Sequence, residues 1–169
     1  MTSSTVVSAC ALYAGPSCAG LNSACRWFVE GFAKRSGIEV NLDIRDGGRR
    51  LTESTELVLF RVLQESLTNV HRHSGATRAD VGLRTAGNSV VLRVKDYGRG
   101  IPPAVLQRLR EDLVAGGVGF AGMTERIREI GGQLEINSSA DGTEVVARVP
   151  ISHRAEPAAL SSNMQEVKG

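Results

Sequence analysis

Apolar and polar side chains follow two different periods along this chain, and the changes between them mark its elements. Apolar residues recur every three or four positions from Leu21 to Phe32, which predicts a helix over 21–36 that ends before Gly37. From Ile38 to Ile44 apolar and polar residues alternate instead, as in a strand with one buried face. The periodic part of the chain therefore starts with a helix followed by a strand.

The remaining elements follow from the same two periods and from the turn residues between them. Gly75 suits the left-handed end of a long helix, and Gly87 and Gly142 suit the turns of two hairpins. The predicted helices cover 54–73, 104–113 and 123–130, and the predicted strands cover 78–85, 89–96, 133–137 and 143–151. Because strands that pair as hairpins are mixed with helices, we expect an α/β fold. It is a two-layer sandwich in which about three helices cover one face of a mixed, mostly antiparallel sheet.

Length and composition add the domain organisation. A chain of 169 residues with 41% hydrophobic and 22% charged side chains is typical of one globular domain. We expect residues 21–151 to form this domain. Residues 1–20 are expected to be an N-terminal remnant or a disordered lead-in. Residues 152–169 lose all periodicity and are expected to be a disordered tail.

Charge and composition exclude several kinds of partner. The chain has 20 Lys and Arg against 18 Asp and Glu, the basic residues are scattered, and 4% of residues are aromatic, so no nucleic acid is expected to bind. The uncharged stretch before Arg26 contains Gly15, Pro16 and many small polar residues, so we expect neither a signal peptide nor a membrane segment. The three cysteines lack the spacing of a zinc site or a disulfide framework, which favours a cytoplasmic protein.

One face of the predicted helix over 54–73 carries polar side chains one turn apart. Glu65 and Asn69 are neighbours on this face, where a carboxylate and an amide oxygen can serve one hard cation such as Mg²⁺. Arg72 on the adjacent edge can meet an anion. A solvated polar face on an amphipathic helix is the alternative interpretation, and this helix alone does not decide between them.

The end of the predicted strand over 89–96 carries a carboxylate where a core residue is expected. Strand alternation puts Asp96 on the same inward face as Val94, and a buried carboxylate needs hydrogen bonds. Gly98 and Gly100 follow, and they allow a flat ligand to approach the backbone closely. An Asp that accepts from an exocyclic amine beside such glycines is what adenine recognition requires, although an ordinary turn containing Asp explains the same residues.

Glycine is in excess, with 19 residues where average composition gives about twelve. Part of this excess lies in residues 117–122, which have the spacing G-x-G-x-x-G. A dinucleotide-binding fold is excluded because a predicted helix, and not a strand, precedes the motif. What remains is a flexible loop whose backbone N–H groups, with the helix that follows, can hold phosphate oxygens.

The order of the three segments resembles a known superfamily. Glu65-x-x-x-Asn69, then Asp96-x-Gly98-x-Gly100, then the G-x-G-x-x-G segment is similar to the motif series of the GHKL ATPases, which include histidine kinases, gyrase, MutL and a heat-shock chaperone. Residues 60–74 and 117–126 look most like the ATP-binding domain of two-component sensor kinases of the nitrate-sensor and DesK type. The resemblance implies the GHKL fold, with ATP and Mg²⁺ as ligands.

The resemblance also implies a role for each matching position. Asn69 would hold Mg²⁺, and Glu65 would assist the metal or polarise the attacking group. Asp96 would accept from the adenine amino group, with Thr143 in support. The other positions that it places at the nucleotide are Arg72 and His73 along the phosphates; Gly98, Gly100 and Ile101 beside the base; and Gly117, Val118, Gly119, Gly122 and Met123 in a lid over the triphosphate. Tyr97 departs from the commoner Asn or Asp, so its contribution stays open.

Kinases of this kind transfer the γ-phosphoryl group to a histidine on a preceding dimerisation domain, and no histidine of this chain matches it. His71 and His73 belong to the nucleotide helix, and His153 lies in the tail. We therefore expect a catalytic domain that presents MgATP to a histidine-bearing dimerisation domain in trans or lost upstream, with a response regulator as a further partner. Two alternatives stay open, which are a regulatory ATP-binding module without transfer and a serine kinase of the anti-sigma-factor type.

Overall fold

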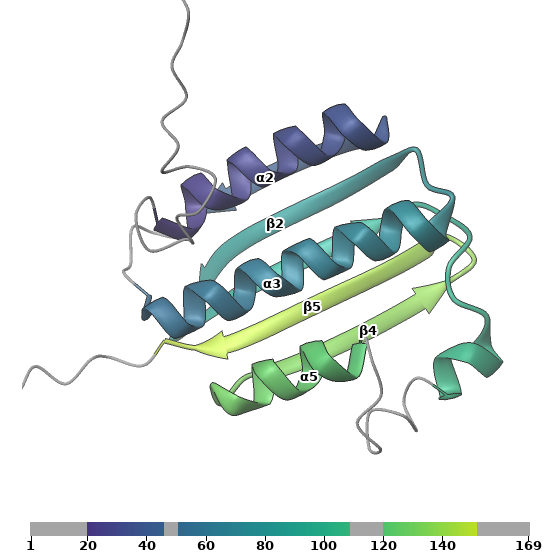
Figure 1. The fold of residues 1–169 in the computed structure, drawn as a ribbon. Coiled ribbons are helices and arrows are strands. Elements are labelled where there is room, and N and C mark those ends of the chain that lie inside the picture. Colours follow the sequence, from purple (N-terminus) through teal and green to yellow (C-terminus); the bar gives the residue numbers. More distant parts are fainter. Residues whose placement is uncertain (1–19, 46–50, 109–119, 152–169) are drawn as a thin grey trace, which may run out of the picture.

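A five-stranded mixed sheet organises the protein. The computed structural model describes residues 20–45, 51–108 and 120–151 (Figure 1). Within these residues the strand order is β1-β2-β3-β5-β4, with β1 and β2 parallel and the other neighbours antiparallel. The strands are β1 (Glu39–Arg45), β2 (Arg78–Ala86), β3 (Ser89–Asp96), β4 (Gln133–Ser139) and β5 (Gly142–Pro150).

Three helices lie side by side across one face of this sheet, with α3 between the other two (Figure 1). They are α2 (Gly20–Ser36), α3 (Glu53–Asn69) and α5 (Phe120–Glu129), and a π-helical turn, η2 (Val70–Ser74), continues α3. Residues 103–108 form a further helical segment. The chain leaves β1, passes through α3 and returns as β2, and this crossover allows the two strands to be parallel. The predicted two-layer sandwich is therefore confirmed.

Local sequence signals explain where α3 begins and ends. Thr52 stands before the helix with φ −71° and ψ 151°, and its hydroxyl accepts from the backbone N–H of Thr55 at 3.2 Å. Gly75 ends η2 with φ 67°, the left-handed conformation that the sequence predicted for it. The side chains of Leu59, Leu63 and Leu67 are fully buried along one stripe of the helix, against the sheet. Burying one leucine contributes about 1.5–3 kcal/mol to stability, so this stripe fixes α3 on the sheet.

Two predicted boundaries differ from the structure by more than one residue. Helix α5 begins at Phe120 and not at Met123, because Phe120 packs against the core and its carbonyl accepts from the hydroxyl of Thr124 at 3.0 Å. The glycines around Phe120 made this turn look like a loop. Strand β4 continues to Ser139, two residues beyond the predicted end, because Ser138 and Ser139 still pair with β5.

Several expectations concern residues that the structure does not describe. The lead-in over 1–19, the tail over 152–169, the second half of the helix predicted over 104–113, and Gly117, Val118 and Gly119 of the lid lie outside the described residues. Within the described ranges, no helix is both long enough and apolar enough to cross a membrane.

Candidate nucleotide-binding site

A cavity of about 640 Å³ opens at one end of the helical layer, between the end of α3, the loop after β3 and the start of β5. Its volume lies within the ~300–1,000 Å³ that is usual for small-molecule sites. Most of the predicted site residues within the described ranges line it, although they come from three separate stretches of the chain. These residues are Glu65, Asn69, Arg72, His73, Asp96, Gly100, Ile101 and Thr143.

Asp96 provides a buried carboxylate in the cavity wall. The residue is 4% exposed, and it lies on the inward face of β3 as strand alternation predicted. One carboxylate oxygen accepts from the backbone N–H of Gly98 at 2.9 Å. Val94 and Val145, paired across β3 and β5, form an apolar wall beside it. A carboxylate in apolar surroundings favours a ligand that donates hydrogen bonds.

The two glycines after Asp96 have a packing role in addition to the one that the sequence suggested. A Cβ at Gly98 would overlap the carbonyl oxygen of Ser74 and lie 2.8 Å from its carbon. Gly100 has φ +68°, and a Cβ there would overlap the carbonyl oxygen of Ser139. Both glycines therefore let the loop pack against protein backbone, and of the two only Gly100 lines the cavity.

Gly142 is a third glycine that bears on the site, and sequence reasoning treated it only as a turn residue. Its φ is +112°, and a Cβ there would overlap the carbonyl oxygen of Asp96 and lie 2.9 Å from Oδ1 of the same residue. The hairpin turn between β4 and β5 thus packs directly against Asp96. The signal was present in the Asp-Gly-Thr spacing, but only the strand order shows that this turn meets the end of β3.

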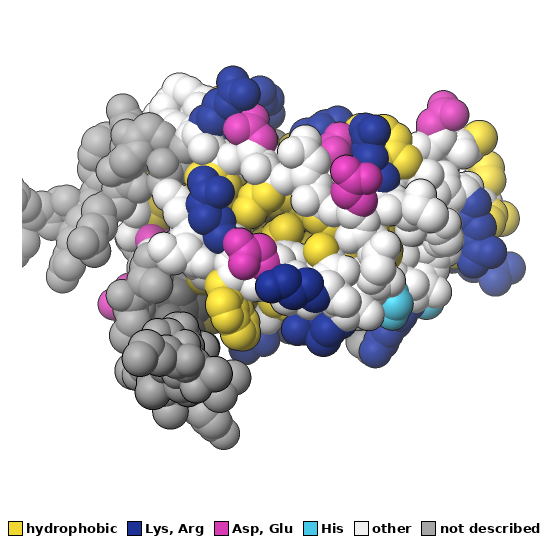
Figure 2. Space-filling view, turned by 90° about the horizontal axis from the view of Figure 1, so that it is seen from above, with side chains coloured by type: hydrophobic (Ala, Val, Ile, Leu, Met, Phe, Trp, Pro, Cys, Tyr) yellow, Lys and Arg dark blue, Asp and Glu magenta, His cyan; other side chains and the backbone are white. Residues whose placement is uncertain are grey.

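The end of α3 and the loop after β3 are joined through Arg99, which sequence reasoning missed. The Arg99 backbone N–H donates to the Ser74 carbonyl at 3.0 Å, and Nε of its side chain donates to the His73 carbonyl at 3.1 Å. Arg99, Arg72 and His73 line the cavity at its rim. Figure 2 shows histidine side chains (cyan) beside Lys and Arg (dark blue) at one end of the molecule. The rim therefore carries groups that suit an anion.

Glu65 and Asn69 line the cavity together, one turn apart on α3. Among the residues that the structure describes, no group of three or more His, Cys, Asp or Glu side chains could hold a metal ion by itself. Mg²⁺ in nucleotide sites is usually held by one or two protein oxygens together with substrate phosphates and water. This pair of oxygen-bearing side chains fits that donor set and does not suit a metal held only by protein.

Tyr97 points away from the cavity. Its hydroxyl donates to the Asp80 carboxylate, and the Arg78 guanidinium lies over its ring at 4.2 Å from the ring centre. Both contacts are on the outer face of the sheet, away from the helices. The replacement of the commoner Asn or Asp by Tyr therefore leaves the cavity lining unchanged.

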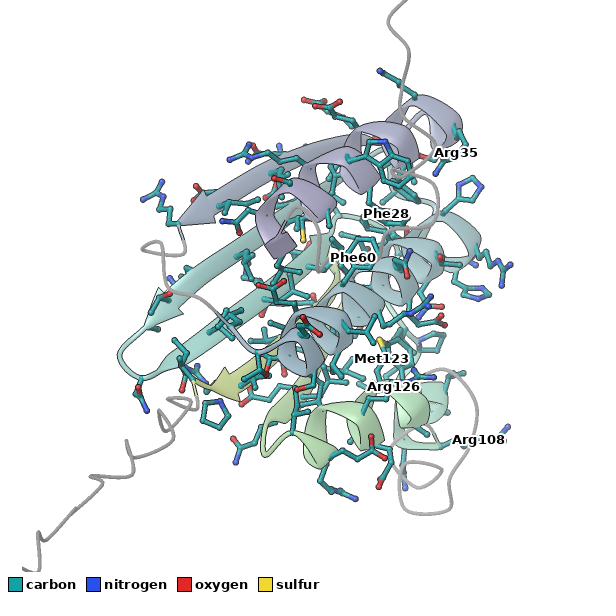
Figure 3. The ribbon with its side chains drawn as sticks, turned by 60° about the vertical axis from the view of Figure 1, so that its left-hand side comes forward. Phe28, Arg35, Phe60, Arg108, Met123 and Arg126 are labelled. Carbon is teal, nitrogen blue, oxygen red and sulfur yellow. The ribbon has the colours of Figure 1, made fainter. Side chains whose placement is uncertain are left out.

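Two of the predicted lid residues do not line the cavity. Met123 is fully buried between α5 and α3, with its sulfur 3.9 Å from the hydroxyl of Ser66, which lines the cavity (Figure 3). Gly122 does not line the cavity either; a Cβ there would make only ordinary contact with the Arg126 side chain, at 3.6 Å. Phe120, a variable position inside the glycine motif, does line it, although no pattern in the sequence singled it out.

A second hollow of about 570 Å³ runs over the solvent side of α3. Phe28 of α2 forms one wall and Arg126 of α5 the other, and the Phe28 ring meets that of Phe60 edge to face, with 5.7 Å between ring centres (Figure 3). Glu65 lines this groove as well as the cavity, so its side chain lies in the wall that the two hollows share.

Other residues of the lining were not anticipated from the sequence. They are apolar or small side chains next to predicted ones, and periodicity marked most of them only as core. They comprise Ser66, Val70, Ser74, Val94, Pro102, Val105 and Val145.

Sequence comparison finds relatives of this chain among sensor histidine kinases. The sensor histidine kinase LiaS of Bacillus subtilis is 33% identical over 133 residues, which is 78% of this chain and 34% of LiaS. The oxygen sensor histidine kinase NreB of Staphylococcus carnosus is 31% identical over 134 residues, which is 79% of this chain and 37% of NreB. The chain thus spans about a third of the length of the curated relatives that it matches.

The fold is similar to that of solved histidine kinase domains. The catalytic domain of the histidine kinase ThkA superposes with a TM-score of 0.64 at 18% identity, over 78% of this chain and 92% of that domain. At this identity the likeness shows the fold, which is that of a histidine kinase catalytic domain. Residues 54–153 match the family described as "Histidine kinase-, DNA gyrase B-, and HSP90-like ATPase". Because this match covers more than half of the chain, the protein belongs to that ATP-binding family.

Proposed function

We propose that this chain binds MgATP and presents its γ-phosphate to a histidine on a dimerisation domain outside this chain. The cavity carries this proposal, because it combines a buried acceptor inside with cationic groups at its rim. Asp96 suits the amino group of adenine, and Arg72, His73 and Arg99 suit the phosphates. This combination matches the two chemically different parts of ATP.

The base is held by the part of the cavity that Asp96, Ile101 and Thr143 line. Asp96 accepts from the exocyclic amino group, and the hydroxyl of Thr143 contacts the ring directly or through a water molecule. Ile101 and Gly100 border the base. The lid of Gly117, Val118, Gly119 and Gly122 covers the phosphates, with Met123 packed behind it. Each of these roles comes from the motif resemblance.

Glu65 and Asn69 hold the metal side of the complex. When Mg²⁺ is bound with ATP, it neutralises charge on the β- and γ-phosphates. The amide oxygen of Asn69 provides one protein ligand, and the Glu65 carboxylate assists from the preceding turn. Two protein oxygens leave the remaining coordination positions to phosphate and water.

Phosphoryl transfer requires a histidine side chain to reach the γ-phosphate. The position of Glu65 supports this step, because it lines both the cavity and the groove over α3. A histidine entering along that groove can donate one ring N–H to Glu65 while its other nitrogen attacks phosphorus. The bond from the γ-phosphorus to the β,γ-bridging oxygen breaks, a nitrogen–phosphorus bond forms, and ADP leaves.

The relatives named above are sensor histidine kinases, so we also propose a two-component system for this chain. In that system the phosphorylated histidine passes its phosphoryl group to an aspartate of a response regulator. The reaction uses cytoplasmic ATP, so we place this domain in the cytoplasm.

The test is phosphorylation with γ-labelled ATP and Mg²⁺. The full chain is incubated alone and with a separately made dimerisation domain that carries its histidine, or with a variant of that domain in which the histidine is Ala. We expect acid-labile label on the domain with histidine and none on its variant. Acid-stable phosphoserine on a partner protein, or tight ATP binding without any transfer, would overturn the proposal in favour of a serine kinase or a regulatory module.

A further inference from the structure

Ser138, near the end of β4, connects two parts of the nucleotide cavity without lining it. Its hydroxyl accepts from the Ile101 backbone N–H at 2.7 Å and lies 3.0 Å from the hydroxyl of Thr143. Ile101 and Thr143 both line the cavity, and Thr143 is the direct cross-strand partner of Ser138. No sequence motif marked Ser138, because it stands 37 positions from Ile101.

The available protons limit the directions that these hydrogen bonds can take. A backbone N–H can only donate, so the Ser138 oxygen is the acceptor for Ile101. The single Ser138 proton then has two possible acceptors, which are the Thr143 hydroxyl at 3.0 Å and the Gly142 carbonyl at 3.4 Å. Strong O–H···O bonds are ~2.5–3.0 Å long, which favours Thr143. When Ser138 donates to Thr143, the proton of Thr143 is left for the cavity.

We propose that Ser138 is a positioning residue that makes Thr143 a hydrogen-bond donor toward the bound base, and so contributes to the choice of a 6-aminopurine. The proposal rests on the nucleotide-binding function proposed above. It names a selectivity device for that site that lies outside the three motifs. Thr143 contacts the base, whereas Ser138 acts only through Thr143 and through the backbone of Ile101.

The chemistry of the purine edge gives the reason. Adenine presents an amino group, a donor, beside the ring nitrogen N1, an acceptor. The Asp96 carboxylate is a hydrogen-bond acceptor, so it matches the amino group, and a donating Thr143 matches N1. In guanine the 6-substituent is a carbonyl oxygen and N1 carries a hydrogen, so the same pair faces the wrong groups. Without Ser138, the Thr143 hydroxyl can rotate, and the Ile101 N–H loses its acceptor.

The experiment compares ATP with 1-deaza-ATP, in which C–H replaces N1 and the amino group is kept. Affinities of the full chain for both nucleotides are measured with Mg²⁺ by calorimetry. We expect the unmodified chain to bind ATP about tenfold more tightly than 1-deaza-ATP, as one buried hydrogen bond implies. The ratio should fall to about one in Thr143→Val and Ser138→Ala, and Ser138→Thr, which keeps a hydroxyl, should restore it.

The control is Ser139→Ala, because this neighbouring hydroxyl accepts from the Asp141 backbone N–H at 3.1 Å and lies on the outer face of β4. Its nucleotide ratio should stay tenfold. If Ser138 has a purely structural role, Ser138→Ala should weaken the binding of both nucleotides equally and leave the ratio of affinities unchanged. That result would overturn the proposal. A tenfold ratio retained in Thr143→Val would overturn it even if Ser138→Ala did not fold.

Failure of the underlying function gives a different result. If the unmodified chain binds ATP and 1-deaza-ATP equally, the role of Ser138 is refuted while ATP binding stands. If it binds neither nucleotide, the proposed function is refuted, and the role of Ser138 with it.

Discussion

Replacing Gly100 by Ala tests whether the loop after β3 is held by its contact with β4. Gly100 has φ +68°, and a Cβ there would overlap the Ser139 carbonyl oxygen and lie 3.1 Å from Oγ of Ser138. The substitution therefore adds two penalties, one from the backbone conformation and one from the overlap. Gly87→Ala is the matched control, because Gly87 has φ +61° in the β2–β3 turn with nothing within 4 Å of its Cβ position.

The two penalties can be separated by magnitude. A left-handed conformation costs a non-glycine residue about 1–2 kcal/mol, and both variants carry this cost. Overpacking against fixed backbone adds about 1–3 kcal/mol, and only Gly100→Ala carries it. We therefore expect Gly87→Ala to lose about 1–2 kcal/mol of unfolding free energy and Gly100→Ala to lose about 2–5 kcal/mol. The loop can avoid part of this loss by moving away from β4, which deforms the cavity.

Urea unfolding measures the loss of stability, and ATP titration measures the deformation of the cavity. Gly87→Ala should bind ATP as the unmodified chain does, while Gly100→Ala should bind at least about tenfold more weakly, because the Ile101 N–H leaves its acceptor. The reasoning is refuted if both variants lose the same unfolding free energy. It is equally refuted if Gly100→Ala keeps the full affinity for ATP.

Three further predictions concern single side chains. Asp96→Asn keeps an oxygen for the loop N–H at 2.9 Å but adds a donor, so ATP affinity should drop by about ten- to a hundredfold with little change in Tm; unchanged affinity in calorimetry would remove Asp96 from the base site. Asn69→Ala should abolish the gain in ATP affinity on adding Mg²⁺, measured against EDTA, and a gain as large as in the unmodified chain would contradict its role. Burial raises the pKa of the Cys25 thiol to about 12. In a variant with Cys10 and Cys18 replaced by Ser, a thiol reagent at pH 8 should therefore react with Cys25 only as fast as the protein opens. This pKa is higher in the folded state than its ordinary value of about 9, so the contribution of the thiol to stability is complete below about pH 9 and is lost as the pH rises toward 12. Urea unfolding at pH 8 and at pH 10 checks the sign of this change.

The sequence predicted the elements well where one period controls a whole segment. The stripe of Leu59, Leu63 and Leu67 identified α3 and its buried face, because a 3.6-residue period repeated over several turns has one orientation that buries it. The start of α5 was wrong, because the glycines on either side of Phe120 signal a loop locally. Packing of Phe120 against the core extends the helix beyond that local signal.

For the site, too, the outcome depends on whether a prediction involves one segment of the chain or several. Asp96 was placed inward correctly, since strand alternation depends only on its own strand. Gly98 and Gly100 were interpreted as leaving room for a ligand; Gly100 does line the cavity, but the Cβ positions of both glycines are occupied by the carbonyl groups of Ser74 and Ser139. A pattern within one segment can show that a Cβ is excluded there, but not which atoms exclude it.

By itself the sequence determined the class of fold, the two faces of each element and the segments that carry polar chemistry, because these are properties of short windows of residues. The tertiary structure alone decided what those segments do to one another. The order β3-β5-β4 brings the Gly142 turn under Asp96 and sets Ser138 between Ile101 and Thr143. These contacts join residues from different elements, so no local pattern contains them, and they shape the wall of the cavity.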